Sequence, residues 1–209
     1  MKKRTRDSGS AAGDDVRNRV LATSFELFTE NGYAGTSTRE IAARARVSKR
    51  DLYAAFPTKQ DMLIACIEGR TAKLRLPTGL PEPRSREMLA SILTEFSTTL
   101  VTETTHPTVV SMFRLAIAES DHSPEVARAL EATRGAIRQT ITELFNRAQS
   151  ASLLSAGQPA AMATQYLALL WEDTMLRMLL GVAKRPTRAE LGRRVAAAVA
   201  AFFALHASR

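Results

Sequence analysis

The sequence is poor in residues that build extracellular, metal-binding or membrane-spanning proteins. It has one cysteine, Cys66, among 209 residues, which leaves no partner for an internal disulfide and no multi-cysteine zinc site. A lone thiol suits a reducing compartment. The most apolar segment, 195–205, is short and follows two arginines, so we expect no membrane span and no membrane partner. The N-terminus is basic without an apolar run behind it, so we expect no secretory signal and a cytoplasmic location.

Signatures of common enzyme classes are also missing. The sequence has no glycine-rich phosphate loop, no nucleophile elbow and no histidine or cysteine cluster at metal-ligand spacing. His106, His122 and His206 are far apart, each near an expected helix end, which favours surface or capping roles. Cys66 lies among apolar residues, which favours a buried inert thiol over a redox sensor. We therefore expect a protein that is not an enzyme and needs neither metal nor cofactor.

What the sequence does contain is positive charge. Lys and Arg number 29 against 21 Asp and Glu, a formal net charge of +8. A polyanion is a natural partner for such a chain. The segment 39–50 is locally dense, with five basic residues against Glu40 alone. A solvated helix face is the simplest interpretation of a charge run. The charge alone therefore does not establish DNA binding.

Apolar residues recur with the helical period along most of the chain, and no segment shows the period of a strand. We expect an all-α fold of about nine helices. Residues 1–13 lack periodicity and are expected to form a disordered basic arm. Prolines and glycine between residues 76 and 83 separate an expected N-terminal domain, 14–75, from a C-terminal domain, 84–209.

Three helix-capping signals divide the N-terminal domain after its first helix. Ser37, Ser48 and Thr58 each precede an acidic residue by three positions, the spacing of a capping box. Two short helices joined by a turn at 45–47 predict a helix-turn-helix. Helices this short need a shared core with the first helix. The residues expected to supply it are Ile41, Ala42, Ala45, Val47, Leu52 and Phe56.

The second short helix would expose a face suited to DNA. Lys49, Arg50 and Tyr53 lie on it, and a helix of this size fits the major groove. Thr38, Tyr53 and Lys59 lie near helix ends, where phosphate contacts occur. Asp51 is expected to cap the helix and not to read a base.

Three runs within residues 15–65 carry a family resemblance: GYAGTSTREIA at 32–42, VSK at 47–49 and LYAAFPTK at 52–59. They resemble the DNA-binding domain of the TetR repressor family. The resemblance implies phosphate contacts from Thr36 and Thr38 and a backbone clamp from Tyr53 and Lys59. It also implies a recognition helix that opens with Ser48, Lys49 and Arg50.

The sequence departs from that family pattern in two ways. Arg46 stands where the family often has glycine in the turn. In a left-handed conformation it costs about 1 kcal/mol more than glycine, or it adds a phosphate contact. Ala54 and Ala55 replace larger residues, so base readout should depend on Lys49, Arg50 and the residues before them.

The C-terminal domain shows a weaker resemblance, carried by the runs 166–171 and 177–182. It is similar to that of AcrR-like, efflux-linked regulators, and it implies that the last two helices pair with those of a second copy. The last helix has an apolar face, which predicts either a dimer interface or an intramolecular core helix. Its residues are Leu191, Val195, Val199, Phe202 and Phe203.

The same resemblance implies an effector pocket inside the C-terminal domain. Methionines and aromatics suit a hydrophobic ligand, and plain core packing is the alternative for each. Glu172 and Asp173 interrupt an apolar helix and either face solvent, pair with Arg177 or favour a cationic ligand. The pocket candidates are Phe96, Met112, Phe113, Trp171, Met175 and Met178.

The sequence therefore predicts a homodimeric repressor that binds a palindromic double-stranded DNA operator and is released by a small hydrophobic effector. The alternative is an all-helical small-molecule-binding protein or enzyme whose DNA-binding half is vestigial. Specific DNA binding with a steep salt dependence distinguishes the first from the second.

Overall fold

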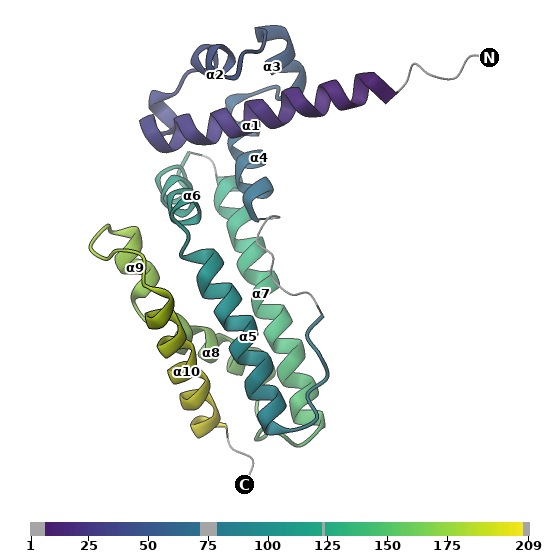
Figure 1. Ribbon diagram of the computed structural model, residues 1–209, viewed down its shortest axis with the longest axis vertical. Coiled ribbons are helices and arrows are strands. Elements are labelled where there is room, and N and C mark those ends of the chain that lie inside the picture. The colour runs from purple at the N-terminus through teal and green to yellow at the C-terminus, as the bar shows by residue number, and fades with distance from the viewer. Residues whose placement is uncertain (1–6, 72–78, 123, 207–209) are drawn as a thin grey trace, which may run out of the picture. The chain divides into compact units, whose positions relative to one another are not determined.

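A computed structural model describes residues 7–71, 79–122 and 124–206, and in these residues the chain forms ten helices and no strand (Figure 1). The all-α prediction is confirmed. The helices are α1 (Asp7–Gly35), α2 (Thr38–Ala45), α3 (Lys49–Ala55), α4 (Lys59–Thr71), α5 (Arg86–Thr104), α6 (Pro107–Ala118), α7 (Pro124–Ser150), α8 (Pro159–Trp171), α9 (Thr174–Leu179) and α10 (Arg188–Leu205).

The chain divides into two compact units, and the division is not a single cut. One unit contains residues 1–72 together with 111–130, and the other contains 73–110 and 131–209. The expected boundary near residue 80 therefore describes only part of the organisation. The end of α6 and the start of α7 group with the helix-turn-helix, a long-range association that no local sequence signal reveals.

The N-terminal unit is built on α1, against which α2, α3 and α4 pack. Val20, Leu27 and Phe28 of α1 are buried. The expected core residues Ile41, Ala42, Ala45, Leu52 and Phe56 are buried as well, and Val47 is half-buried. Burial of this shared apolar surface holds together helices that are too short to persist alone.

The three capping signals are confirmed. The side chain of Ser37 accepts the Glu40 N–H at 3.1 Å, and Ser48 accepts the Asp51 N–H at 3.1 Å. Thr58 accepts the Asp61 N–H at 3.0 Å, while the Asp61 carboxylate accepts the Thr58 N–H at 2.9 Å. Each pair satisfies N–H groups that have no partner inside the helix.

The start of α1 differs from the expectation. Residues 7–13 are helical, so the predicted disordered arm is too long, and residues 1–6 lie outside the described residues. The glycines of this segment weaken a helix by about 1 kcal/mol each but do not stop it as proline would. At the other end, Gly32 takes φ 75° and ψ 164°, a non-helical conformation that glycine adopts readily, and it kinks α1 three residues before its end.

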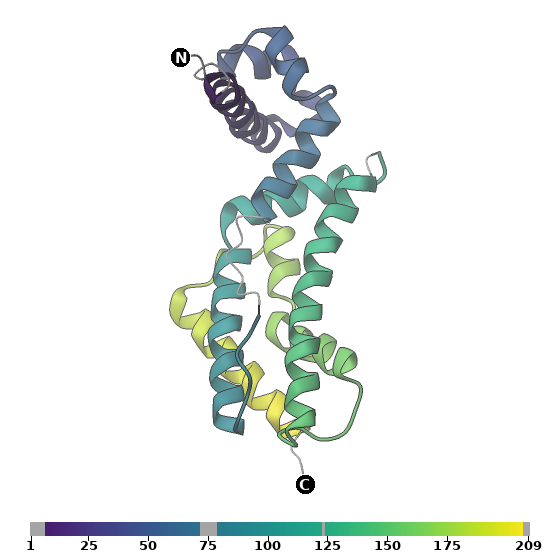
Figure 2. The same ribbon diagram turned by 90° about the vertical axis from the view of Figure 1, so that its right-hand side faces the viewer.

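The C-terminal unit has an aromatic centre. Helices α5, α7, α8 and α10 supply its core, and Figures 1 and 2 show α5 and α7 side by side. Phe145 and Phe202 stack with ring centres 4.5 Å apart, and Tyr166 meets both rings edge-on. The Tyr166 hydroxyl lies 2.5 Å from that of Ser97. Burial raises the pKa of Tyr166 to about 12, so the phenol stays neutral inside this core.

The apolar helix that Glu172 and Asp173 interrupt in the sequence is broken at these residues into α8 and α9. Glu172 takes a φ of 44° and a ψ of −127° at the break. Its carboxylate accepts a hydrogen bond from Arg194 of α10 at 2.8 Å, and Asp173 lies 3.9 Å from Arg177. Both side chains are exposed, and Asp173 pairs with Arg177, so the structure shows the first two alternatives for this acidic pair. The partner of Glu172 is Arg194 and not Arg177.

Candidate nucleic-acid interface

The turn between α2 and α3 has the geometry of a tight helix-turn-helix. Arg46 ends α2 with φ 56° and ψ 47°, in the left-handed conformation. Its N–H bonds the Ala43 carbonyl at 3.2 Å, and the Val47 N–H bonds that of Ala42 at 3.0 Å. These bonds close the end of α2 as glycine usually does, while the Arg46 side chain is exposed.

Helix α3 has one buried side chain, Leu52, and an outward face with Lys49, Arg50 and Tyr53 exposed. The hydroxyl of Ser48 donates to the Asp51 carboxylate at 2.7 Å as it accepts the Asp51 N–H. Asp51 is therefore a cap, as expected. The Ser48 hydroxyl is committed to the same cap.

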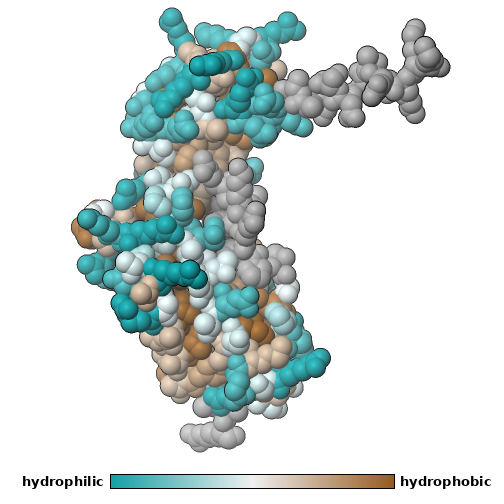
Figure 3. Space-filling model, viewed as in Figure 1, coloured by the Kyte–Doolittle hydropathy of each residue, from teal (hydrophilic) through white to brown (hydrophobic). Residues whose placement is uncertain are grey.

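Most of the basic run 39–50 is free of acidic partners. No carboxylate of the described residues lies within 4 Å of the basic groups of Arg39, Arg46, Lys49 or Arg50. Arg44 differs, because it pairs with Glu30 at 2.8 Å and with Glu26 at 3.8 Å. The hydrogen bond that Arg44 donates to the Glu30 carboxylate raises the pKa of Arg44. In Figure 3 the helix-turn-helix presents mainly hydrophilic side chains.

Two hydroxyl groups meet beside this surface. Thr38 Oγ1 and Tyr53 Oη lie 3.0 Å apart, and Tyr53 is 45% exposed. Thr38 is the first residue of α2, where helix N–H groups favour anions. The pair therefore has the position and chemistry expected of a phosphate contact.

Thr36 and Lys59 do not fit their expected phosphate contacts. Thr36 is 2% exposed, and its hydroxyl donates to the carbonyls of Gly32 at 2.8 Å and Leu27 at 3.1 Å. The Lys59 ammonium donates to the carbonyls of Tyr33 at 2.7 Å and Thr36 at 2.9 Å. Both side chains tie the end of α1 to its neighbours and are held away from a ligand.

A contact that the sequence analysis missed joins α1 to the end of α3. Arg17 Nη1 donates to the Ala55 carbonyl at 3.1 Å, and the guanidinium lies 4.3 Å from the centre of the Phe56 ring. Arg17 precedes the buried Val20 by three residues, so helical spacing already places both on one face of α1.

The apolar face expected at a dimer interface is turned into the chain itself. Leu191, Val195, Val199 and Phe202 are buried in the core of the C-terminal unit, and Phe203 is half-buried against it. This corrects the expected interface, because side chains already covered within one chain have little surface left for a second copy. These residues belong to an intramolecular core helix, which is the alternative interpretation of the apolar face.

The outward face of the last helices carries small side chains. On α10, Gly192, Ala196, Ala200 and Ala204 recur every four residues and are exposed, and on α8 Ala161 and Ala168 are exposed. In Figure 3 the surface is light brown and moderately apolar at the lower left, where Figure 1 places α10. Small residues let two helix backbones approach closely, so this face, and not the buried one, suits helix pairing.

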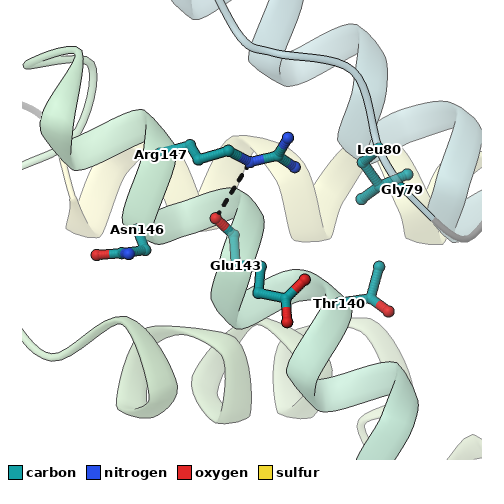
Figure 4. Close-up of a pocket in the computed structure, with 6 residues that line it drawn as sticks. All are labelled: Gly79, Leu80, Thr140, Glu143, Asn146 and Arg147. Carbon is teal, nitrogen blue, oxygen red and sulfur yellow. Dashed lines mark hydrogen bonds between the residues drawn. The ribbon is translucent and has the colours of Figure 1, made fainter.

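The six effector candidates do not form one cluster. Met112 and Phe113 belong to the N-terminal unit, and the other four belong to the C-terminal unit. Phe96, Met112 and Met178 are buried, and the rest are half-buried. None of them lines the depression of about 300 Å³ in Figure 4, where Arg147 extends toward segment 79–80. Its lining is mainly polar: Gly79, Leu80, Thr140, Glu143, Asn146 and Arg147.

The part of the chain that the structure describes has neither a metal-binding cluster nor a helix suited to a membrane. No group of three or more His, Cys, Asp or Glu side chains is placed to hold a metal ion there. Within the same residues, no helix has both the length and the apolar character that a membrane crossing requires.

Comparison with known proteins decides the family. The model of bacterial regulatory proteins of the tetR family matches residues 20–66. The model of the AefR-like transcriptional repressor C-terminal domain matches residues 91–208, more than half of the chain. The chain belongs to the TetR family of transcriptional regulators. The C-terminal match is AefR-like, and the AcrR-like, efflux-linked subtype stays a prediction.

Individual relatives of this TetR-family chain agree with that assignment. The uncharacterized regulator YezE of Bacillus subtilis is 27% identical over 117 residues, which cover 54% of this chain and 59% of YezE. The chain thus matches less than two thirds of that relative's length.

Two solved structures cover more of both chains. A TetR regulator of Agrobacterium tumefaciens is 26% identical with a TM-score of 0.79, covering 91% of this chain and 94% of the other. The flavonoid-responsive regulator FrrA is also 26% identical, with a TM-score of 0.74 and coverage of 91% and 96%.

Proposed function

We propose that the protein is a homodimeric transcriptional repressor that binds a palindromic operator through α3 and leaves it when a small hydrophobic effector binds. The observation that carries DNA binding is the set of four cations on α2, the turn and α3 that have no acidic partner among the described residues: Arg39, Arg46, Lys49 and Arg50. Lysine and arginine on a helix of this size reach guanine edges and phosphates in the major groove. An intact turn and recognition helix argue against a vestigial domain.

The dimer follows from DNA geometry and from the small-residue face. Two recognition helices about 34 Å apart reach successive major grooves. We assign subunit pairing to Gly192, Ala196 and Ala200 of α10 and to Ala161 and Ala168 of α8, all exposed in the single chain. Two such faces packed together would form a four-helix arrangement.

Release by an effector needs a route to α3. The buried face of α4, which includes Met62 and Cys66, packs on α1. Ser24 Oγ lies 3.8 Å from Met62 Sδ, and Cys66 Sγ donates to the Leu21 carbonyl at 3.4 Å. We propose that effector binding moves α4 and residues 111–130, which share a compact unit with α3.

An electrostatic observation supports the second part of this route. Burial, and then the charges of Glu119, Asp61 and Glu125, raise the pKa of Tyr33. The negative charges of Glu119 and Glu125 thus affect Tyr33, whose carbonyl accepts the hydrogen bond from Lys59. A shift of the segment that carries these two glutamates would act directly on the base of the helix-turn-helix.

Selection from a randomised DNA pool tests the proposed function. We expect the wild-type protein to enrich an inverted repeat whose half-sites lie about one helical turn apart. Sedimentation of the complex should show at least two chains on each selected duplex. Failure to enrich any sequence would contradict the proposal.

The effector is tested with a panel of flavonoids, the class named for FrrA. We expect at least one flavonoid to raise the unfolding temperature and to weaken binding to the selected duplex. Thermodynamic linkage requires that the duplex weaken flavonoid binding by the same factor. A panel that changes neither quantity would exclude this class of effector.

A further inference from the structure

The recognition helix α3 is held by few contacts. It has seven residues, and Leu52 is its one fully buried side chain. Helices of two turns do not persist without tertiary support. The Ser48 cap fixes the beginning of α3, so the direction of the helix depends on what holds its other end.

At that other end the buried ring of Phe56 follows the helix, and the last carbonyls need a partner of their own. The last carbonyls of a helix have no partner inside it and carry partial negative charge. No basic residue occupies the last turn of α3, which ends in Ala54 and Ala55. Water or a donor from elsewhere in the fold can satisfy these carbonyls.

Arg17 of α1 is this donor. Its guanidinium makes a 3.1 Å hydrogen bond to the Ala55 carbonyl and lies 4.3 Å from the centre of the Phe56 ring. Phe56 is 2% exposed and follows α3 directly. The planar guanidinium thus bonds the helix end with one edge while its positive charge lies against the aromatic ring.

We infer that Arg17 is a positioning residue for DNA recognition, one that sets the direction of α3 without reading a base itself. This inference rests on the proposed DNA-binding function. Lys49 and Arg50 lie at the start of α3, Leu52 in its middle and Ala55 at its end. Loss of the tie at Ala55 lets α3 turn about Leu52, which moves the base-reading side chains. Recognition needs those side chains held to within about 0.5 Å.

The test uses a duplex that the wild-type protein selects, and a set of duplexes with one base pair changed. The variants are Arg17→Gln and Arg17→Lys. Arg19→Gln is the matched control, because Arg19 lies on the same helix and is exposed with a single ion pair, to Asp15 at 3.4 Å. Affinities are measured over a series of salt concentrations.

We expect Arg17→Gln to lower discrimination between the selected and altered duplexes by roughly tenfold, the size of one good base contact. The slope of log affinity against log salt should stay unchanged. Arg17→Lys keeps the charge but not the flat guanidinium, so it should fall between Arg17→Gln and the wild type. Arg19→Gln should keep full discrimination.

A uniform loss on all duplexes, with the slope reduced by about one, would make Arg17 a phosphate contact and overturn the inference. Unchanged binding would overturn it too. If Arg17→Gln loses helicity, a double-mutant cycle of Arg17→Lys with Arg50→Ala decides: non-additive losses support positioning, and additive losses contradict it. Failure of the wild-type protein to select any duplex would instead refute the proposed function, and this role of Arg17 with it.

Discussion

The ammonium group of Lys59 is fixed on Tyr33, 2.7 Å from its carbonyl oxygen and 4.1 Å from the centre of its ring. The same group bonds the Thr36 carbonyl at 2.9 Å. These contacts join the first turn of α4 to the segment that leads from α1 into α2. Lys59 therefore stabilises the helix-turn-helix from within, although its position in the sequence suggests a phosphate contact.

Substitution of Lys59 by methionine should destabilise the protein by about 1–3 kcal/mol, because two carbonyls lose a charged donor. The salt slope of DNA binding should stay unchanged. Lys49→Met is the control, because Lys49 is exposed and has no acidic partner among the described residues. In this variant the salt slope of DNA binding should fall, and the free energy of unfolding should stay unchanged. Urea unfolding and DNA titrations measure both quantities. If Lys59→Met has normal stability and a reduced salt slope, Lys59 is a phosphate contact after all.

Substitution of Arg50 by alanine should weaken binding to the selected duplex more than binding to random DNA. Arg50 is exposed in the first turn of α3, where a good base contact contributes about 1–3 kcal/mol of discrimination. Arg188→Ala, an exposed arginine at the start of α10, should change neither affinity. Equal losses on both DNAs would show that Arg50 contacts only phosphate.

A charge placed on the outward face of α10 should separate the subunits. Ala200 is exposed in the single chain, and a glutamate there would be buried unpaired in the proposed dimer. We expect Ala200→Glu to sediment as a monomer with native helicity. Ala136→Glu, at an exposed position of α7, should stay dimeric. A dimeric Ala200→Glu variant would place the interface elsewhere.

His206 should make stability depend on pH. Burial lowers the pKa of His206 in the folded protein below its ordinary value of 6.5. Its Nε2 lies 2.8 Å from Gln165 Oε1, and its ring lies 4.7 Å from that of Phe202. The folded state thus binds fewer protons than the unfolded state. This contribution is complete above pH 6.5 and is lost as pH falls through the folded-state pKa.

The unfolding free energy of the wild type, relative to His206→Gln, should therefore decrease between about pH 7.5 and about pH 5.5. Urea unfolding at each pH gives the difference directly. A difference that is constant, or that grows on acidification, would show that the imidazole is not disfavoured as a cation in the folded state.

Local features of the structure follow from the sequence. Capping at Ser37, Ser48 and Thr58, the left-handed Arg46 and the exposed face of α3 each depend on residues a few positions apart, so spacing predicts them. At the break, Glu172 accepts a hydrogen bond from Arg194, which is 22 residues away. The apolar periodicity of this segment predicts a helix, but it carries no information about an ion pair with a distant residue.

Side-chain direction is what the sequence leaves open. The apolar stripe of α10 is equally suited to a chain's own core or to a second copy, and the packing of α5, α7 and α8 decides for the core. Lys59 and Thr36 are polar residues in DNA-contact positions of the family pattern. In the structure, however, both side chains donate hydrogen bonds to nearby backbone carbonyls. Whether such a side chain bonds a carbonyl of its own chain or a DNA phosphate depends on distances in the folded structure, which the sequence does not show.

The most direct test of DNA recognition by α3 is one titration series. Wild-type protein is added to the selected duplex and to a scrambled duplex of equal composition, over a range of salt concentrations. We predict that the selected duplex binds at least about 10³-fold more tightly near physiological salt. Both affinities should fall steeply with salt, because lysine and arginine release counterions from DNA. Equal affinity for the two duplexes at every salt concentration would contradict recognition by α3.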